Sequence, residues 1–466
     1  MVVVRERAGR PGPLLVVMCV GMFLVLLDVT VVNVALPAIA DGLAGGRERL
    51  QWVVDGYAVA IASLLLGAGS VGDRIGHRRV VLLGLALFGL ASAGAAAAPD
   101  AAVLVAARVV QGIGAALLLP GSLALIADAY PDRGAQARAL GIWAGVSSLA
   151  LPAGPLLGGL LVGAGGWRLV FLINLPVVAG ALVAVPLVAA RGVRRPGRSP
   201  DLAGMALAAA TLAGLVYAVI EAGHRGFGPA TVVAAVVALC AGAGFLVRQR
   251  LAAAPMLPLG LLARPAFTGP NLAALLMNLT FNGVLYALTL YLQGVLGWSA
   301  PVAGLSLLPL FLPLALLAPL AGRCAGRFGP RPVLVAGAAI AAAGVAALAV
   351  LARVGPAGGY PAVLPALLGM GVGAGLFTAP VVSAAVRAVP AERAGLASGV
   401  NNTARQTGTA LGVAIFGARL AGASGPAGFT HRLGELGLLG GALWLAALVI
   451  VAMTTGSGPA EGAARR

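Results

Sequence analysis

Long apolar runs constrain this chain more than any other feature of its sequence. A helix needs about 20 residues to cross the roughly 30 Å hydrocarbon core of a bilayer. Runs of that length lie at residues 13–37, 51–71, 80–98, 101–127, 139–164, 168–190, 202–220, 230–247, 268–292, 301–320, 332–352, 361–384, 395–418 and 434–454. Strands of membrane barrels are about half as long and alternate in polarity. The runs therefore predict an all-α integral membrane protein with fourteen transmembrane helices.

The scarcity of charge supports a chain solvated mostly by lipid. Charged residues make up 10% of the sequence and hydrophobic residues 60%, whereas soluble proteins carry about 25% charged residues. This composition excludes a soluble enzyme. The net charge of +17 does not indicate nucleic-acid binding, because the basic residues form short clusters between the apolar runs.

Arginine placement predicts the orientation of the chain. An even number of spans puts both termini on one side, and cytoplasmic loops carry the excess of basic residues. The termini and alternate loops hold 22 arginines, the other loops hold seven, and Arg108 and Arg405 lie inside spans. We therefore expect a multi-pass protein of the bacterial inner membrane with both termini in the cytoplasm.

An internal repeat divides the chain. The segment from Gly69 to Arg78, between the second and third spans, recurs from Gly322 to Arg331 between the tenth and eleventh. We predict a six-helix bundle at 1–190, two inserted transmembrane helices with their loops at 191–264, and a second six-helix bundle at 265–466. Two such halves with a binding site between them are typical of alternating-access transporters.

Five segments carry a family resemblance. They are Leu27–Pro37, Gly69–Arg79, Arg108–Gly114, Gly154–Gly159 and Trp167–Pro176. Together they resemble the fourteen-span drug:proton antiporters of the major facilitator superfamily, the EmrB/QacA type. The residues Gly154, Pro155, Gly158 and Gly159 resemble the motif associated with antiporters. The resemblance implies proton-coupled export of a hydrophobic or amphipathic small molecule, driven by the proton-motive force without a cofactor. The alternatives are export of an endogenous metabolite, lipid or siderophore, and, more distantly, a membrane receptor or scaffold.

Two charges inside the predicted spans point to proton coupling. An ionised side chain in the bilayer normally faces a cavity or a partner. Asp28 and Arg108 come out at similar depths, about 13 Å and 10 Å from the outer surface at 1.5 Å per residue. We predict a contact between them, direct or through water, with Gln111 one turn further on. Either Asp28 carries a proton, or the pair is a permanent neutralising contact.

Asp55 is the third candidate for proton coupling. It lies near the outer mouth of the second span, where it is either a solvated acid at a helix start or a second proton or cation site. Trp52 and Tyr57 beside it are either cavity aromatics or an interfacial belt.

Polar stripes indicate a substrate cavity. Asn278, Asn282 and Tyr286 recur at helical spacing in the ninth span, and the thirteenth span carries Asn402 and Gln406. Hydrogen bonding between helices is the alternative interpretation. We assign to the cavity the residues Asn33, Trp52, Tyr57, Gln111, Asn278, Asn282, Tyr286, Asn402 and Gln406.

A cytoplasmic charge cluster predicts a conformational latch, which the resemblance favours over a plain solvated loop. Its members are Gly69, Asp73, Arg74, Gly76, Arg78, Asp128 and Arg133. No cluster of residues with metal-ligand spacing appears in the sequence, so we expect no metal site. The expected partners are the lipid bilayer, protons and the substrate.

Overall fold

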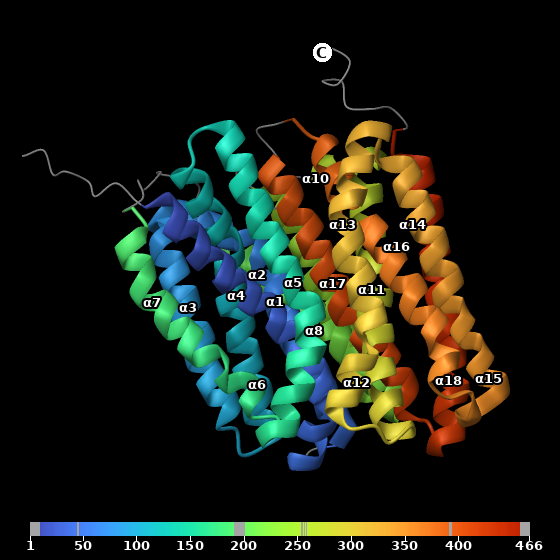
Figure 1. Cartoon of the computed structure of the whole chain (residues 1–466). Coiled ribbons are helices and arrows are strands. Elements are labelled where there is room, and N and C mark those ends of the chain that lie inside the picture. The colour runs from blue at the N-terminus through green and yellow to red at the C-terminus, as the bar shows by residue number, and fades with distance from the viewer. Residues whose placement is uncertain are drawn as a thin grey trace, which may run out of the picture.

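The computed structural model describes residues 10–43, 46–190, 201–252, 255, 257, 259–390 and 394–456, and this part of the chain is almost entirely helical (Figure 1). The N-terminal bundle contains α1 (Pro11–Gly42), α2 (Gly46–Ile75), α3 (His77–Ala96), α4 (Ala101–Ala129), α5 (Arg133–Gly165), α6 (Leu169–Leu172) and α7 (Asn174–Val188). Two further long helices follow, α8 (Leu202–Arg225) and α9 (Pro229–Leu251).

The C-terminal bundle begins after the short helix α10 (Leu259–Leu262). It contains α11 (Pro265–Leu290), the π-helical turn η1 (Tyr291–Val295), α12 (Ala300–Ser306), α13 (Leu308–Phe328), α14 (Pro330–Ala346), η2 (Ala347–Val350), α15 (Leu351–Val354), η3 (Gly355–Gly358), α16 (Gly359–Arg387), α17 (Ala394–Ala421) and α18 (Gly425–Thr454). The last helix begins earlier than the predicted 434, because Pro426 at its start allows a helical turn ahead of the apolar run.

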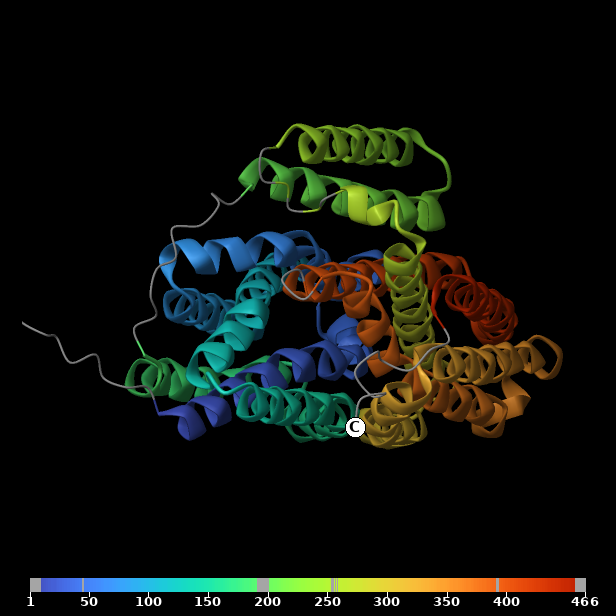
Figure 2. The same cartoon turned by 90° about the horizontal axis from the view of Figure 1, so that it is seen from above.

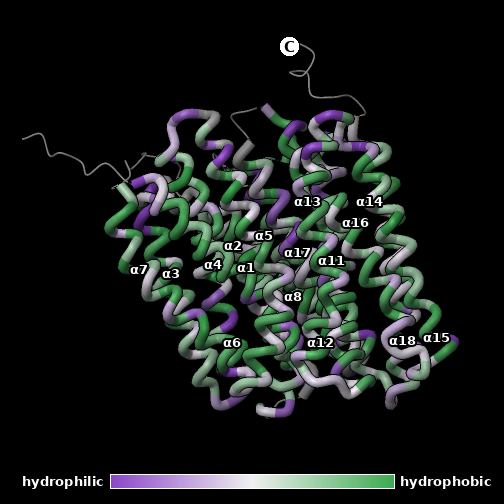
Figure 3. Tube along the Cα trace, in the orientation of Figure 1, coloured by the Kyte–Doolittle hydropathy of each residue, from purple (hydrophilic) through white to green (hydrophobic). Residues whose placement is uncertain are grey.

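Each bundle has its own apolar core. One cluster joins residues of α1, α3, α4 and α7, and another joins α11, α13, α14, α16 and α18. Helices α8 and α9 pack on each other, and α8 packs on α2 and α17. Figure 2 shows this pair along one edge of the molecule, beside the two bundles. Hydrophilic residues gather toward the two ends of the helices (Figure 3).

Eleven helical segments of the described residues are long and apolar enough to cross a membrane. This is fewer than the fourteen predicted, for three reasons. Residues Pro330–Arg387 form one continuous segment that includes both α14 and α16. The second predicted span contributes only a shorter apolar stretch, Leu50–Leu65, and α17 is not among the eleven. Multiple membrane passes are therefore present.

The sequence repeat corresponds to a repeated turn. Gly76 joins α2 to α3 with φ 95°, and Gly329 joins α13 to α14 with φ 85°. Only glycine adopts this conformation at no steric cost. The two positions are equivalent in the repeat, so each bundle reverses direction in the same way at this point.

The two bundles touch closely at the end of the molecule opposite the start of α1. There Gln293 donates a hydrogen bond to the carbonyl of Val34 (3.0 Å). Gly159 of α5 lies against Ala300 and Pro301 of α12, where an added Cβ would come within 2.7 Å of backbone atoms. Small residues therefore permit backbone-to-backbone contact between the halves.

Asp201 fastens the α8–α9 hairpin. Its carboxylate caps α8 by accepting from the Gly204 N–H (2.9 Å), and it also accepts from Arg248 Nε (3.0 Å) and Gln249 Nε2 (3.2 Å) at the end of α9. Burial raises the pKa of Asp201, but these hydrogen bonds outweigh it, so the pKa lies below its ordinary value. The carboxylate thus joins the start of one helix to the end of the next.

We expect Asp201→Ala to destabilise the first turn of α8 by about 1 kcal/mol at neutral pH, through loss of the cap. Because the folded-state pKa is lowered, the contribution is complete above the unfolded value of about 3.9 and is lost as pH falls through the folded value. Amide hydrogen exchange in α8 should therefore differ most between wild type and variant at pH 7, and the difference should shrink toward that shown by Asp201→Asn as pH falls through the folded-state pKa. Asp201→Asn keeps an acceptor without the charge and should fall between the two. A difference that persists unchanged at low pH would contradict the assignment.

Candidate functional site

An ion pair lies inside the N-terminal bundle, between α1 and α4. Arg108 Nη1 donates to Asp28 Oδ2, and each residue is 1% exposed. The predicted contact is confirmed and is direct. Two desolvated charges are stable only when their remaining donors and acceptors are also satisfied, which makes the surrounding hydrogen bonds part of the site.

Arg108 uses its donors on three helices. Besides the bond to Asp28, Nη1 donates to Gln111 Oε1 (2.9 Å), and Nε donates to the carbonyl of Val53 in α2 (2.8 Å). Its guanidinium carbon also lies 4.3 Å from the ring centroid of Tyr57. The planar fork of arginine has five N–H donors and stacks on aromatic faces. The position of this cation is therefore fixed by α1, α2 and α4 together.

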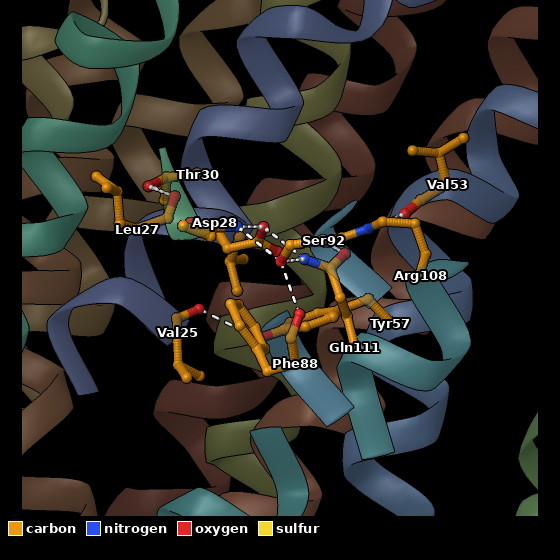
Figure 4. A network of polar contacts seen from close by, with 12 residues as sticks. Val25, Leu27, Asp28, Thr30, Val53, Tyr57, Phe88, Ser92, Arg108 and Gln111 are labelled. Atoms are coloured by element: carbon orange, nitrogen blue, oxygen red, sulfur yellow. Dashed lines mark hydrogen bonds and ion pairs between the residues drawn. The ribbon is translucent and has the colours of Figure 1, made fainter. Parts of the chain in front are cut away.

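The carboxylate of Asp28 is held by two amides (Figure 4). Gln111 Nε2 donates to Oδ1 at 3.4 Å, as the spacing predicted, and Asn174 Nδ2 of α7 donates to the same oxygen at 3.3 Å. Both amides also donate to the hydroxyl of Ser92 in α3, at 2.8 and 3.2 Å. The Ser92 hydroxyl in turn donates a hydrogen bond to the carbonyl of Phe88 (2.7 Å).

Ser92 and Asn174 were not assigned a role from the sequence. Asn174 stands in the fifth segment of the family resemblance, and Ser92 is a small polar residue in an Ala- and Gly-rich span. Neither carries a charge, so the cost of burying a charge in a membrane span does not single them out. With them, five polar side chains form one connected network, here called the charge network: Asp28, Ser92, Arg108, Gln111 and Asn174.

The segment that resembles the antiporter motif links α1 to the C-terminal bundle. A Cβ added at Gly154 would overlap the side chain of Thr30, two residues from Asp28 on α1. Gly158 lies against the backbone of Val31, and Gly159 against α12. Helix α5 is therefore clamped between the helix of the charge network and the other half of the molecule.

Asp55 is fully buried in α2, nine residues after the helix begins. Both carboxylate oxygens lack a hydrogen-bond partner among the described residues. The interpretation of Asp55 as a solvated acid at a helix start is therefore wrong. The apolar side chains around it, including Val53 and Val54, keep water from this part of α2.

The aromatic residues near Asp55 contact neighbouring helices. Trp52 packs against Tyr217 of the inserted helix α8, with ring centroids 6.3 Å apart. Tyr57 donates to the carbonyl of Val25 (3.1 Å) and stacks under Arg108. These contacts leave the assignment of Trp52 and Tyr57 to a substrate cavity a prediction. The same holds for Gln111, which belongs to the charge network.

The polar stripe of α11 meets α17. Asn282 Nδ2 donates to Thr409 Oγ1 (3.1 Å), and Asn401 Nδ2 donates to Asn271 Oδ1 (3.1 Å). These contacts favour hydrogen bonding between helices for Asn282, and Asn278 donates within its own helix to the carbonyl of Ala274 (2.9 Å). Tyr286 is buried among residues of the N-terminal bundle. On α1, Asn33 donates to Val29 (2.9 Å), with its Oδ1 unpartnered in the described structure.

Two predicted cavity residues, Asn402 and Gln406, are partly buried on α17. Both lie on the same helix as the Asn401 and Thr409 contacts, and their cavity role stays a prediction.

The latch is only partly described. The side chains of Asp73 and Arg133 lie outside the described residues, and Gly69 lies within α2. Arg78 donates to the carbonyl of Pro186 at the end of α7 (3.0 Å), whereas Arg74 and Asp128 are exposed. The latch therefore stays a prediction.

A cavity of about 510 Å³ lies at the far end of α8, between α17 and α18. Its lining includes Arg419, Arg432 and Glu435, and it shares no residue with the charge network. Arg419 pairs with Glu435 (2.9 Å), and Arg432 donates to the carbonyl of Arg419 (2.7 Å). Among the described residues, no group of three or more His, Cys, Asp or Glu side chains is arranged to hold a metal ion.

Comparison with known proteins places these features in a family context. The sequence profile described as Major Facilitator Superfamily matches residues 18–413. The chain is 37% identical over 420 residues to the tetracenomycin C resistance and export protein of Streptomyces glaucescens, which covers 89% of this chain and 76% of that protein. It is 36% identical over 402 residues to the multidrug resistance protein Stp of Mycobacterium tuberculosis, covering 86% and 74%.

The fold is similar to that of a solved transporter. A crystal structure of a D-xylose–proton symporter aligns with a TM-score of 0.65 and 15% identity, covering 93% of this chain and 96% of the symporter. At this identity the likeness shows the helical arrangement alone.

The charge network predicts that Asp28 and Arg108 each stabilise the protein only while the other keeps its charge. Arg108→Gln leaves Asp28 buried without its cation, and Asp28→Asn leaves Arg108 without its anion. Each should destabilise the protein by about 3–5 kcal/mol. The double variant Asp28→Asn/Arg108→Gln contains no unpaired charge and should recover most of the loss. Melting temperatures in one detergent, measured by size-exclusion chromatography after heating, test this. Additive losses in the double variant would show that the two side chains do not interact.

Proposed function

The chain belongs to the Major Facilitator Superfamily, and we propose that it is a proton-coupled exporter of hydrophobic or amphipathic compounds, antibiotics among them. Its relatives include proteins named for tetracenomycin C resistance and export, multidrug resistance and puromycin resistance, at 36–37% identity over more than four fifths of the chain. The relatives support the export function, and the charge network supports the coupling to protons.

We further propose the fourteen-span architecture of the EmrB/QacA type. Counting α14 and α16 as separate spans adds one to the eleven segments, and α2 and α17 add two more, because each is long enough to cross. The pair α8–α9 is then the insertion between two six-span bundles, with boundaries near 191 and 264. The arginine distribution supports an inner-membrane protein with both termini in the cytoplasm.

Asp28 is the proposed proton carrier. The observation that supports this role is the set of hydrogen bonds that its buried carboxylate accepts. In its ionised state the carboxylate accepts from Arg108, Gln111 and Asn174. A proton on Asp28 removes the charge that Arg108 balances, and the cation keeps only neutral acceptors, Gln111 and the Val53 carbonyl. The two protonation states therefore favour different arrangements of α1, α4 and α7.

Helix α5 can transmit that change to the other half. Thr30 lies two residues from Asp28 and packs on Gly154, and Gly159 of the same helix packs on α12. Because Gly154 and Gly159 contribute no side chain to these contacts, a small shift of α1 reaches the contact between bundles with few rotamers to absorb it. Proton binding is thereby linked to opening and closing of the halves, which is the requirement for exchange.

We expect Asp28→Asn to abolish proton-driven transport while leaving substrate exchange in the absence of a gradient. The amide keeps the size of the carboxylate but cannot carry a proton. The measurement is uptake of a dye and antibiotic panel into proteoliposomes acidified inside, compared with equilibrium exchange.

Asp100→Asn is the matched control. Asp100 is exposed and caps α4 through the N–H groups of Ala102 and Val103, a role that asparagine also fills. It should transport normally. Undiminished uphill transport by Asp28→Asn would overturn the assignment of the proton carrier.

The charge on the substrate should decide the effect of voltage. If one proton exchanges for a neutral compound, a proton-motive force of about 150 mV supplies about 3.5 kcal/mol, enough for roughly a 300-fold gradient. That cycle moves one net charge, whereas exchange for a monocation moves none. A potential imposed at equal pH should therefore accelerate export of neutral compounds and leave monovalent cations unaffected.

Asp55, which is buried without a hydrogen-bond partner among the described residues, is the candidate second proton carrier if voltage does drive export of a monocation. Voltage-driven export of a monocation requires at least two protons per cycle. Asp55→Asn should then remove the voltage dependence and spare exchange driven by the pH gradient. Retention of voltage dependence by Asp55→Asn would exclude Asp55 as the second carrier.

A further inference from the structure

Arg405 is a cation in α17 without a counterion. Its Nε is buried and has no hydrogen-bond acceptor, and within the described residues no ion pair reaches its side chain. The sequence explains why: residues 222–391 contain no Asp or Glu, and α17 contains none. In α18 the carboxylate Glu435 pairs with Arg419 near the far end of the helix. Among the described residues of the C-terminal bundle, Glu435 is the one carboxylate, and its arginine partner is Arg419 and not Arg405.

The position of Arg405 on the helix directs it toward α11. It is four residues after Asn401, which donates to Asn271, and three and seven before Gly408 and Gly412, which lie against the backbone of α11. Residues at this spacing share one face of a helix. Arg405 also lies eleven residues after the start of α17, about 16 Å along its axis. That depth is beyond the phosphate groups of lipids.

A second unfilled group lies on the same face. The Oδ1 atom of Asn401 is buried without a donor, one turn from the buried Nε of Arg405. Buried polar atoms are nearly always paired. An orphaned donor and an orphaned acceptor at adjacent positions of one face indicate a ligand that has both an anionic oxygen and a hydrogen-bond donor.

Asp55 is not the counterion of Arg405. Val413 of α17 is buried with Val53 and Val54, and Gly417 lies against Gln51, so the two antiparallel helices place Asp55 near the level of residue 413. Arg405 is eight residues away, about 12 Å along the helix axis. Asp28 is already paired with Arg108 in the other bundle.

We propose that Arg405 binds a carboxylate of the transported compound, with Asn401 accepting a hydrogen bond from the same molecule. The inference rests on the proposed export function and specifies its substrate class as amphipathic monoanions. The flat fork of a guanidinium matches a carboxylate through two parallel hydrogen bonds. In this arrangement the substrate anion and the proton bind in different bundles.

The experiment uses matched acids and esters on the full-length protein. Binding of mycophenolate, fusidate and lithocholate, each of which has a hydroxyl group as well as a carboxylate, is compared with binding of their methyl esters, in detergent and without a proton gradient. Wild type should bind the acids about 30-fold more tightly than the esters, a difference of about 2 kcal/mol. Arg405→Gln should bind acid and ester alike, and Arg405→Lys, which keeps the charge but not the flat fork, should keep only part of the preference. Ester binding should be equal in all variants, which shows that the variants are folded.

Arg432→Gln is the matched control, because Arg432 lines the cavity between α8, α17 and α18. It should keep the acid preference. Three results would overturn the inference. The first is that wild type does not distinguish acid from ester, and the second is that Arg432→Gln rather than Arg405→Gln removes the acid preference. The third is that the double variant Arg405→Gln/Asp55→Asn regains the acid preference that Arg405→Gln lacks. Proton-driven uptake of neutral panel compounds tests the export function separately, so export without acid preference rejects only the role of Arg405.

Discussion

The ion pair between Asp28 and Arg108 imposes conditions that the rest of the N-terminal bundle satisfies. Desolvating two charges costs several kcal/mol per ion, and their attraction offsets this cost only with good geometry and further hydrogen bonds. The bundle supplies those bonds from four other positions: Gln111, Ser92, Asn174 and the Val53 carbonyl. Helices α1, α2, α3, α4 and α7 therefore take part in one polar site. Any change in the charge of Asp28 affects all of them.

Small residues determine how such a change can spread. Hydrophobic burial does not drive helices together inside a membrane, so close packing and hydrogen bonds hold them. Gly154, Gly158 and Gly159 let α5 touch α1 on one side and α12 on the other. Gly408 and Gly412 do the same for α17 against α11. These contacts have little freedom to deform.

The sequence predicted features that depend on one dominant force. Apolar length identified the helices, and the cost of buried charge identified Asp28, Arg108 and their contact. It was less informative where neutral groups compete. Ser92 and Asn174 carry no charge, and an aromatic side chain such as Trp52 packs equally well on a cavity wall or on the inserted helix α8. Asp55 was misread because position within an apolar run does not show what a neighbouring helix covers. Those outcomes depend on tertiary packing, which periodicity does not encode.

The charge network and the polar groups around Arg405 differ in how completely they are satisfied, and this difference bears on the proposed exchange. The charge network of the N-terminal bundle closes on itself, whereas Arg405 and Asn401 in the C-terminal bundle leave a donor and an acceptor unfilled. If the proton and the substrate bind in different bundles, they do not compete for the same atoms. Their exchange must then be enforced by the relative position of the halves, since a ligand shifts a conformational equilibrium only by its different affinity for the two states. The close contacts of α5 with α12 and of α2 with α17 are the places where both affinities act on the same movement.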